Sequence, residues 1–318
     1  MKRFSVTRSM SLILTVQLAT VVVATAGQQW SDWGAAVPVT EINTTAGEGC
    51  TIESPNGKEL YFASNRTGGL GANDIWVAKR KNLNQPWGEP KNLGEPVNSA
   101  AADFCPTPLP DKSLFFVSER PGPDTCNAGP GKPDIYLTRG SIEHGWSTPQ
   151  HLGCIEKGSA PNSNGAEFSP SFVETKDGTF LFFSSDIDDN DGDTVAGEHD
   201  IYVSVVNKDG SFGKPERIKE LSTDADDRYV NVSKDGREIV FSSNRPGGSG
   251  GLDVWYSSRS SVRDPWSPPV NLGTNINTAN PETRPTFSWD HKRLYFGRTI
   301  SGNGDAYVST RSKVKDKK

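Results

Sequence analysis

The stretch Ser233-Lys-Asp-Gly-Arg-Glu-Ile-Val-Phe-Ser-Ser-Asn-Arg245, followed by Asp253-Val-Trp255, decides the fold of this chain. It consists of a turn at Asp235-Gly236, a short apolar strand, a glycine-rich loop and a further strand. The same order of features recurs five times in the 318 residues, at intervals of roughly 52 to 67 residues. The sequence is therefore one unit of short strands written five times.

Each copy contains an apolar run suited to burial between sheets, with a turn before it and a third strand after it. The runs are Leu60-Tyr-Phe-Ala-Ser64, Leu114-Phe-Phe-Val-Ser118, Leu181-Phe-Phe-Ser-Ser185, Ile239-Val-Phe-Ser-Ser243 and Leu294-Tyr-Phe-Gly-Arg298. The third strands begin at Asp74, Asp134, Asp200, Asp253 and Asp305. This pattern predicts an antiparallel sheet in every copy.

A fourth repeated element predicts the outer strand of each sheet. It has an aromatic residue, usually a proline three residues later, and an aliphatic residue six later, as expected of an outer strand. It follows repeats one to four as Trp87/Pro90/Leu93, Trp146/Pro149/Leu152, Phe212/Pro215/Ile218 and Trp266/Pro269/Leu272, whereas Trp33/Ala36/Val39 precedes the first repeat. We therefore predict an all-β, five-bladed β-propeller closed by an N-terminal outer strand. A six-bladed ring with one degenerate blade is the alternative, but no sixth central strand is visible.

The repeated unit Ser-x-Asp-Gly-x-x-Leu-Tyr-Phe-x-Ser-x-Arg, with its later Asp-Ile-Tyr, resembles the WD40-like β-propeller repeat of the TolB type. The best copies are Ser54–Trp76 and Ser233–Trp255, and the third copy departs from the pattern by carrying Asp186 where the others offer an arginine. The resemblance implies a propeller, often in exported bacterial proteins, that acts by interaction rather than by catalysis. It implies no particular ligand, because the fold hosts many functions.

The N-terminus has the features of an export signal. Basic residues precede the apolar run 12–24, and Ala24-Thr25-Ala26 provides the small residues of a cleavage site. An uncleaved anchor is the alternative, but the run is shorter than the ~20 residues of a spanning helix. We expect a signal peptide over 1–26, a single propeller domain over 27–312, a polar tail over 313–318 and a periplasmic or secreted protein.

Charge excludes one class of partner. The net charge is -5 and the isoelectric point about 5.5, with both signs interspersed. Nothing resembles the concentrated basic face that neutralises phosphates, so nucleic acid is not an expected partner.

Five carboxylates occupy equivalent positions just before the first strand of each repeat, where the strands should surround the axis of the ring. They are Glu48, Asp103, Glu167, Asp227 and Glu282. As a ring near the mouth of the channel they could bind a cation or a polar ligand, or supply two acids for glycoside cleavage. The structural interpretation, in which each accepts backbone N–H groups or pairs with an arginine of its own blade, is favoured because all five copies share it.

The third-strand aspartates form a second repeated set, together with Arg66, Arg120, Arg245 and Arg298. We expect buried ion pairs between an arginine and an aspartate of this set to fix the loop that joins the second and third strands.

The third repeat carries an acidic loop, Asp186-Ile-Asp-Asp-Asn-Asp-Gly-Asp193. Asp186, Asp188, Asn190, Asp191 and Asp193 could together supply several of the six to eight oxygens that calcium takes. The spacing does not fit an EF-hand, because the glycine is out of register. A calcium site and a solvated acidic loop both remain open, and no other cofactor is indicated.

The chain has four cysteines and four histidines. An exported chain usually oxidises an even number of cysteines. Of the three possible pairings, position favours Cys50–Cys105 with Cys126–Cys154. The histidines lack metal-ligand spacing, and no nucleophile elbow precedes them, so the sequence predicts neither zinc nor serine-hydrolase chemistry.

These patterns favour a non-catalytic binding module that contacts a protein or an extracellular or envelope saccharide on one face of the propeller. The alternative is a glycoside hydrolase or lyase that uses two of the five channel-mouth carboxylates. A scaffold within an envelope complex is a third possibility.

Overall fold

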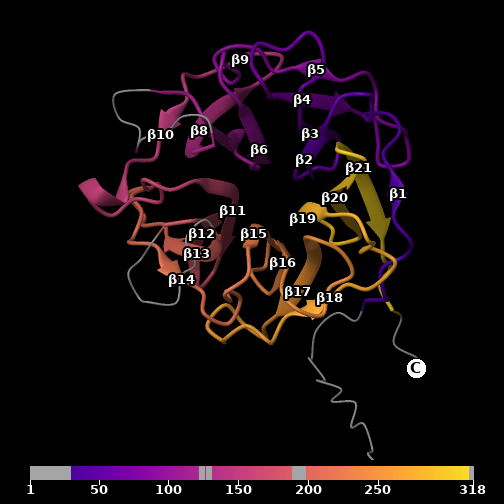
Figure 1. The fold of residues 1–318 in the computed structure, drawn as a ribbon. Helices are drawn as coiled ribbons and strands as arrows, with labels where there is room; N and C mark the ends of the chain where they lie inside the picture. The colour runs from indigo at the N-terminus through magenta and orange to yellow at the C-terminus, as the bar shows by residue number, and fades with distance from the viewer. Residues whose placement is uncertain (1–29, 122–125, 127–130, 188–197, 315–318) are drawn as a thin grey trace, which may run out of the picture.

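The architecture is a closed ring of five antiparallel sheets, seen in a computed structural model that describes residues 30–121, 126, 131–187 and 198–314. Figure 1 shows the five blades around a central axis, with the N-terminal strand β1 next to the C-terminal strand β21. The five-bladed, all-β propeller predicted from the repeats is therefore confirmed. The predicted signal peptide and most of the predicted tail lie outside the described residues, so those boundaries stay predictions.

Each blade has an inner, a second, a third and an outer strand. The inner strands are β2 (Glu48–Glu53), β6 (Asp103–Pro108), β11 (Glu167–Thr175), β15 (Asp227–Val232) and β19 (Glu282–Phe287). The second strands are β3 (Glu59–Ser64), β7 (Ser113–Ser118), β12 (Gly178–Ser185), β16 (Glu238–Ser243) and β20 (Arg293–Ile300). The third strands are β4 (Asp74–Lys79), β8 (Asp134–Ser141), β13 (Asp200–Val205), β17 (Asp253–Ser258) and β21 (Asn303–Thr310).

The outer strands are short, as expected for proline-flanked edge strands. They are β5 (Lys91–Asn92), β10 (Gln150–His151), β14 (Glu216–Arg217), β18 (Val270–Asn271) and β1 (Val37–Pro38). Blade 2 also carries β9 (Gly145–Trp146), which pairs with β8, and a 3-10 helix, η1 (Ile155–Lys157). Within the described residues no helix has the length and apolar character needed to cross a membrane.

The N-terminal outer strand closes the ring. Strand β1 pairs with β21 through Val37 opposite Val308. Further hydrogen bonds join the two segments, from the backbone N–H of Gly34 to the carbonyl of Thr310 and from that of Val39 to the carbonyl of Ala306. The last blade thus obtains its fourth strand from the start of the chain.

The hydrophobic core is divided among the blade interfaces. Phe62 of blade 1 packs with Tyr295 of blade 5, and Phe116 packs in a cluster with Tyr61 between blades 1 and 2. Equivalent clusters lie between the remaining neighbours, and Trp33 joins the one between blades 4 and 5. The apolar central strands are buried because each is covered by a sheet on both faces.

Strand register defines the two faces of the molecule. In blade 1, Glu48 lies opposite Ser64, which lies opposite Asp74, so the inner and third strands begin at the same end. We call the face at this end the loop face. The four-to-one and two-to-three loops emerge there, and every residue considered for the functional site lies on it.

Candidate functional site

The five inner-strand carboxylates are buried on the loop face, each with an exposed fraction of at most 3%. In every blade the residue four positions earlier binds the carboxylate through both its backbone N–H and its side-chain hydroxyl. These residues are Thr44, Ser99, Ser163, Thr223 and Thr278. Each carboxylate thereby holds the loop that leads into its own inner strand.

Four of the five carboxylates also pair with an arginine of their own blade. The N–O distances are 2.9 Å for Arg66–Glu48, 2.6 Å for Arg120–Asp103, 2.5 Å for Arg245–Asp227 and 2.7 Å for Arg298–Glu282. The same arginines donate to a backbone carbonyl of the preceding loop, such as that of Leu221. These contacts fit the structural interpretation, and a ligand-binding or catalytic role for the five stays a prediction.

The expected pairs between these arginines and the third-strand aspartates do not form. Asp74 instead accepts the backbone N–H groups of Leu70 and Gly71 and the amide of Asn92. Both carboxylates stand opposite the end of the second strand, and each arginine turns toward the inner-strand one, where it also reaches a carbonyl of the preceding loop. The aspartates and arginines therefore fix two different loops.

Glu167 is the exception among the five, because Ile187 stands where blades 1, 2 and 4 have arginine. The backbone N–H of Ile187 donates to Ser185 as that of Arg66 does to Ser64, so the sequence was wrong in matching Asp186 to the arginines. Burial raises the pKa of Glu167 to about 8, against the hydrogen bonds from Ser163 and Ser185, which lower it. Asp186 accepts the backbone N–H of Ala166 at 2.6 Å, as Asn65 accepts that of Gly47 in blade 1. A pKa of about 8 favours the protonated form of Glu167 at neutral pH.

The acidic loop is described only at its start. Asp186 lines a cavity of about 770 Å³ together with Ser163, Ser185, Lys132 and Lys214. The other predicted calcium ligands, Asp188, Asn190, Asp191 and Asp193, lie outside the described residues. One carboxylate, already bound to a backbone N–H, gives no test of a calcium site, which stays a prediction.

Both predicted disulfides form. Cys50–Cys105 joins the inner strands of blades 1 and 2, and Cys126–Cys154 joins two loops of blade 2. The structure therefore confirms the pairing that the sequence favoured.

Each inner strand has a β-bulge at the second residue after its carboxylate, a feature that sequence reasoning missed. The register shifts there in every blade, and the residue has a positive φ of 47–60°. Such a conformation is uncommon for residues other than glycine, and bulges redirect side chains. The five residues are Cys50, Cys105, Ser169, Tyr229 and Arg284.

This ring of bulge residues is chemically asymmetric, whereas the carboxylate ring is not. Cys50 and Cys105 form the disulfide, and the hydroxyl of Ser169 lies 3.5 Å from the sulfur of Cys105. On the other side, the guanidinium of Arg284 lies 4.3 Å from the ring centre of Tyr229 and donates to its hydroxyl at 3.2 Å. Five equivalent positions thus present sulfur, hydroxyl, aromatic and cationic groups.

Arg284 lacks a carboxylate partner among the described residues. Its side chain is half-buried and spans from Tyr229 toward blade 1, where a Cβ on Gly49 would lie 3.8 Å from its Cδ. The neighbouring Arg228, by contrast, forms an ion pair with Asp226 at 2.9 Å. A guanidinium held in place without a counter-charge is suited to bind an external carboxylate.

The bulge residues could have been found from the sequence. Every repeat has a carboxylate at the same position, and the residue two positions later differs in chemical type from repeat to repeat. A position that varies while its neighbours repeat is a candidate for a functional role. The frame itself gave no reason to place those side chains near one another.

Comparison with known proteins identifies the fold alone. No known protein family's sequence profile matches the chain, and no curated protein matches its sequence. A structure titled "Glycoside hydrolase" is 11% identical with a TM-score of 0.57, covering 91% of this chain and 92% of that one. The α-L-arabinofuranosidase from Lactobacillus brevis is 10% identical with a TM-score of 0.56, covering 88% and 95%.

TolB from Acinetobacter baumannii is 16% identical with a TM-score of 0.46, and this chain covers 57% of its length while 86% of this chain is matched. At such identities a shared propeller carries no activity with it. The WD40-like name stays an interpretation of the sequence.

Proposed function

We propose that this chain is an exported, non-catalytic binding module that takes a carboxylate-bearing group of a saccharide or protein at the loop-face mouth of the propeller. The observation that carries the proposal is Arg284, a half-buried guanidinium without a carboxylate partner in the described part of the chain. Its place in the ring of bulge residues puts it beside the axis, where a ligand can approach from the loop face. Two disulfides fit an extracytoplasmic location.

Tyr229 supports this role by fixing the arginine. The tyrosine is 6% exposed, and Arg228 and Arg284 lie 4.9 and 4.3 Å from its ring centre. The ring is therefore covered and is not a stacking platform for a sugar. It orients the guanidinium, so less conformational entropy is lost when a ligand binds.

A binding assay with matched arginine variants tests the proposal. Wild type is titrated with oligouronates, with the corresponding neutral oligosaccharides and with acidic peptides, because uronates and peptides are the two sources of a carboxylate. We expect Arg284→Ala to weaken binding on the order of 10–100-fold, since a charge-assisted hydrogen bond is lost. Arg284→Lys keeps the charge but loses the forked geometry and should fall between the two.

The control is Arg263→Ala, because Arg263 is largely exposed and pairs with Asp177 away from the loop face. It should bind as wild type does. If the Arg284→Ala protein bound every carboxylate ligand as tightly as wild type does, the proposal would be contradicted.

A glycosidase remains a second candidate because of one observation. Glu167, with its pKa raised to about 8, and Asp227, paired with Arg245, are two carboxyl groups in unequal environments. Such a pair is what general acid–base hydrolysis requires. Both side chains are fully buried, however, so substrate access would require an opening of the loop face.

Turnover on a panel of plant and bacterial polysaccharides, abolished in Glu167→Gln or Asp227→Asn, would establish the hydrolase. Binding that depends on Arg284, with no turnover of any polysaccharide in the panel, would instead support the binding module.

A further inference from the structure

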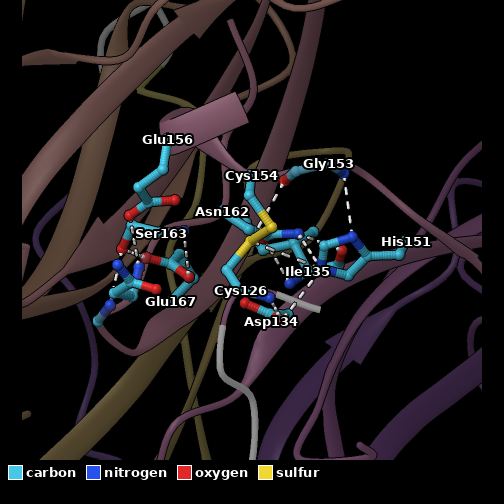
Figure 2. Close-up of a disulfide and its surroundings, with 12 residues drawn as sticks. Cys126, Asp134, Ile135, His151, Gly153, Cys154, Glu156, Asn162, Ser163 and Glu167 are labelled. Carbon is cyan, nitrogen blue, oxygen red and sulfur yellow. Dashed lines mark hydrogen bonds and ion pairs between the residues drawn. A yellow bond between two sulfur atoms is a disulfide. The ribbon is translucent and has the colours of Figure 1, made fainter. Parts of the chain in front are cut away.

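Blade 2 carries a cluster of metal-type side chains that the spacing of the histidines did not reveal. The sulfurs of Cys126 and Cys154 and a ring nitrogen of His151 all lie within 4.8 Å of one another. Asp134, the first residue of β8, lies 3.0 Å from Nε2 of His151. Figure 2 shows His151 and Asp134 beside the disulfide, with Ser163 and Glu167 on its other side.

The cluster is confined to one blade, although the framework around it is repeated. At the position of His151 the outer strands of blades 1 and 4 have Asn92 and Asn271, which donate to the equivalent third-strand aspartates at 2.8 Å. An asparagine would therefore satisfy the structural need in blade 2. Histidine occurs only in the blade that also has two cysteines in contact with this position.

A carboxylate oxygen beside the cluster is available to a ligand. Asp134 is 1% exposed, and its Oδ1 is buried without a hydrogen-bond partner among the described residues, as is Oδ1 of the equivalent Asp253 in blade 4. A buried carboxylate oxygen left unpaired is costly, so such atoms call for a partner. Two sulfurs, an imidazole nitrogen and this carboxylate are a donor set that zinc takes in tetrahedral sites.

We propose that Cys126, Cys154, His151 and Asp134 form a redox-controlled zinc site, closed by the disulfide when oxidised and able to bind Zn²⁺ when reduced. Reduction by a dithiol or phosphine reductant takes up two electrons and two protons and converts the disulfide to two thiols. Binding of Zn²⁺ to both thiolates then releases two protons to solvent. Zinc would thus join the same two loops that the disulfide joins in an oxidising compartment.

Binding at His151 requires one local rearrangement. The backbone N–H of Gly153 donates to Nδ1 at 3.1 Å, which leaves Nε2 to carry a proton toward Asp134 at 3.0 Å. The amide nitrogen of Asn162 also lies 3.0 Å from Nε2. With zinc on Nε2 the proton moves to Nδ1, and the hydrogen bond from Gly153 is replaced. Asp134 changes from acceptor of that proton to ligand of the metal.

The test is zinc binding by the full chain after it has been unfolded, reduced and refolded in excess phosphine, so that burial of the sulfurs does not limit reduction. Competition with a chromophoric chelator measures stoichiometry and affinity, and substitution by Co²⁺ reports thiolate ligands through charge-transfer absorption. We expect one zinc per reduced wild-type chain and none for the oxidised chain. Cys126→Ser/Cys154→Ser, which retains the other two cysteines, should bind none.

His151→Asn is the matched variant, because asparagine occupies this position in two other blades and keeps the hydrogen bond to the aspartate. We expect it to refold and to bind zinc at least ~10-fold more weakly, with Asp134→Asn weakened by a similar factor. Equal zinc affinity of wild type and His151→Asn, or no stoichiometric binding by reduced wild type, would overturn the proposal. Zinc that leaves the unfolding midpoint of the reduced chain unchanged would do so too, since a zinc site stabilises the folded state.

Discussion

A single substitution within a repeated frame changes the charge of one carboxyl group. Glu167 is bound by the residue four positions earlier, as the other inner-strand carboxylates are, but Ile187 stands where blades 1, 2 and 4 have arginine. Without a cation, burial dominates and favours the protonated form. The other four carboxylates hold their loops beside an arginine, whereas Glu167 does so without one.

The stability of the protein should therefore depend on pH in an unusual direction. The pKa of Glu167 is about 8 in the folded chain against an ordinary 4.5, so the folded state binds the proton more tightly. The free energy of unfolding should fall as pH rises from about 4.5 to about 8, by up to a few kcal/mol. Glu167→Gln mimics the neutral acid and should remove this dependence, as measured by urea unfolding at several pH values.

Glu282→Gln is the matched control, because Glu282 has the same place in blade 5 and pairs with Arg298. Leaving that arginine buried without its partner should cost about 3–5 kcal/mol. If Glu167→Gln destabilised the protein at pH 8 as strongly as Glu282→Gln does, the carboxyl would be ionised and the interpretation wrong.

At this scale the sequence was informative about which residues repeat and less so about their partners. It identified the carboxylates and arginines but assigned the arginines to Asp74 and its equivalents, when they bind the inner-strand carboxylates. Both acids lie a few residues from the arginine along one sheet end. In blade 1 both acids stand opposite Ser64, so the repeat does not show which of them the guanidinium reaches.

The closing strand shows what a single element contributes. The Trp33/Ala36/Val39 motif could be recognised in the sequence because it repeats the outer-strand pattern at a displaced position. The structure confirms that β1 pairs with β21. In the structure Trp33 packs 6.3 Å from Phe287, ring centre to ring centre, and lies under the guanidinium of Arg311. Its burial joins the N-terminal segment to the interface between blades 4 and 5.

Truncation of this anchor should loosen the ring. Trp33→Ala removes a side chain that is 7% exposed and should lower the free energy of unfolding by about 3–5 kcal/mol. Val37→Ala, in the adjoining strand β1 at a position that is 55% exposed, should change it by less than about 0.5 kcal/mol. Thermal and urea unfolding would measure both, and equal effects of the two changes would refute the assigned role of Trp33.

At the scale of the molecule, the five hydrophobic clusters each join two neighbouring blades, and together they complete the closed ring. The predicted fold followed from the repeat, since each apolar strand needs a neighbour on both sides. The ring of bulge residues, by contrast, was not predicted. Cys50 and Arg284 hold the same place in their repeats, but the apolar pattern gives no sign of the bulge that redirects their side chains. The candidate site therefore forms only when the ring of blades is closed.

The disulfide in that ring should contribute to global stability. Cys50 and Cys105 are separated by 55 residues, and a loop of that size corresponds to about 4 kcal/mol in the chain-entropy treatment. Cys50→Ser/Cys105→Ser should therefore lower the midpoint of urea unfolding. The slope of the transition should rise, because the unfolded chain loses a constraint and exposes more surface. An unchanged midpoint would mean that ring closure alone constrains blades 1 and 2.

Pairing of β1 with β21 also sets an order of events. The last blade needs residues from both ends of the chain, and Trp30 meets Lys313 beyond the paired strands. A polypeptide that is synthesised or translocated from its N-terminus must keep this first segment unpaired until its final strand arrives. Completion of the toroid is therefore necessarily late, and a chain stalled before residue 303 presents an unsatisfied sheet edge to whatever chaperone or neighbouring copy is at hand.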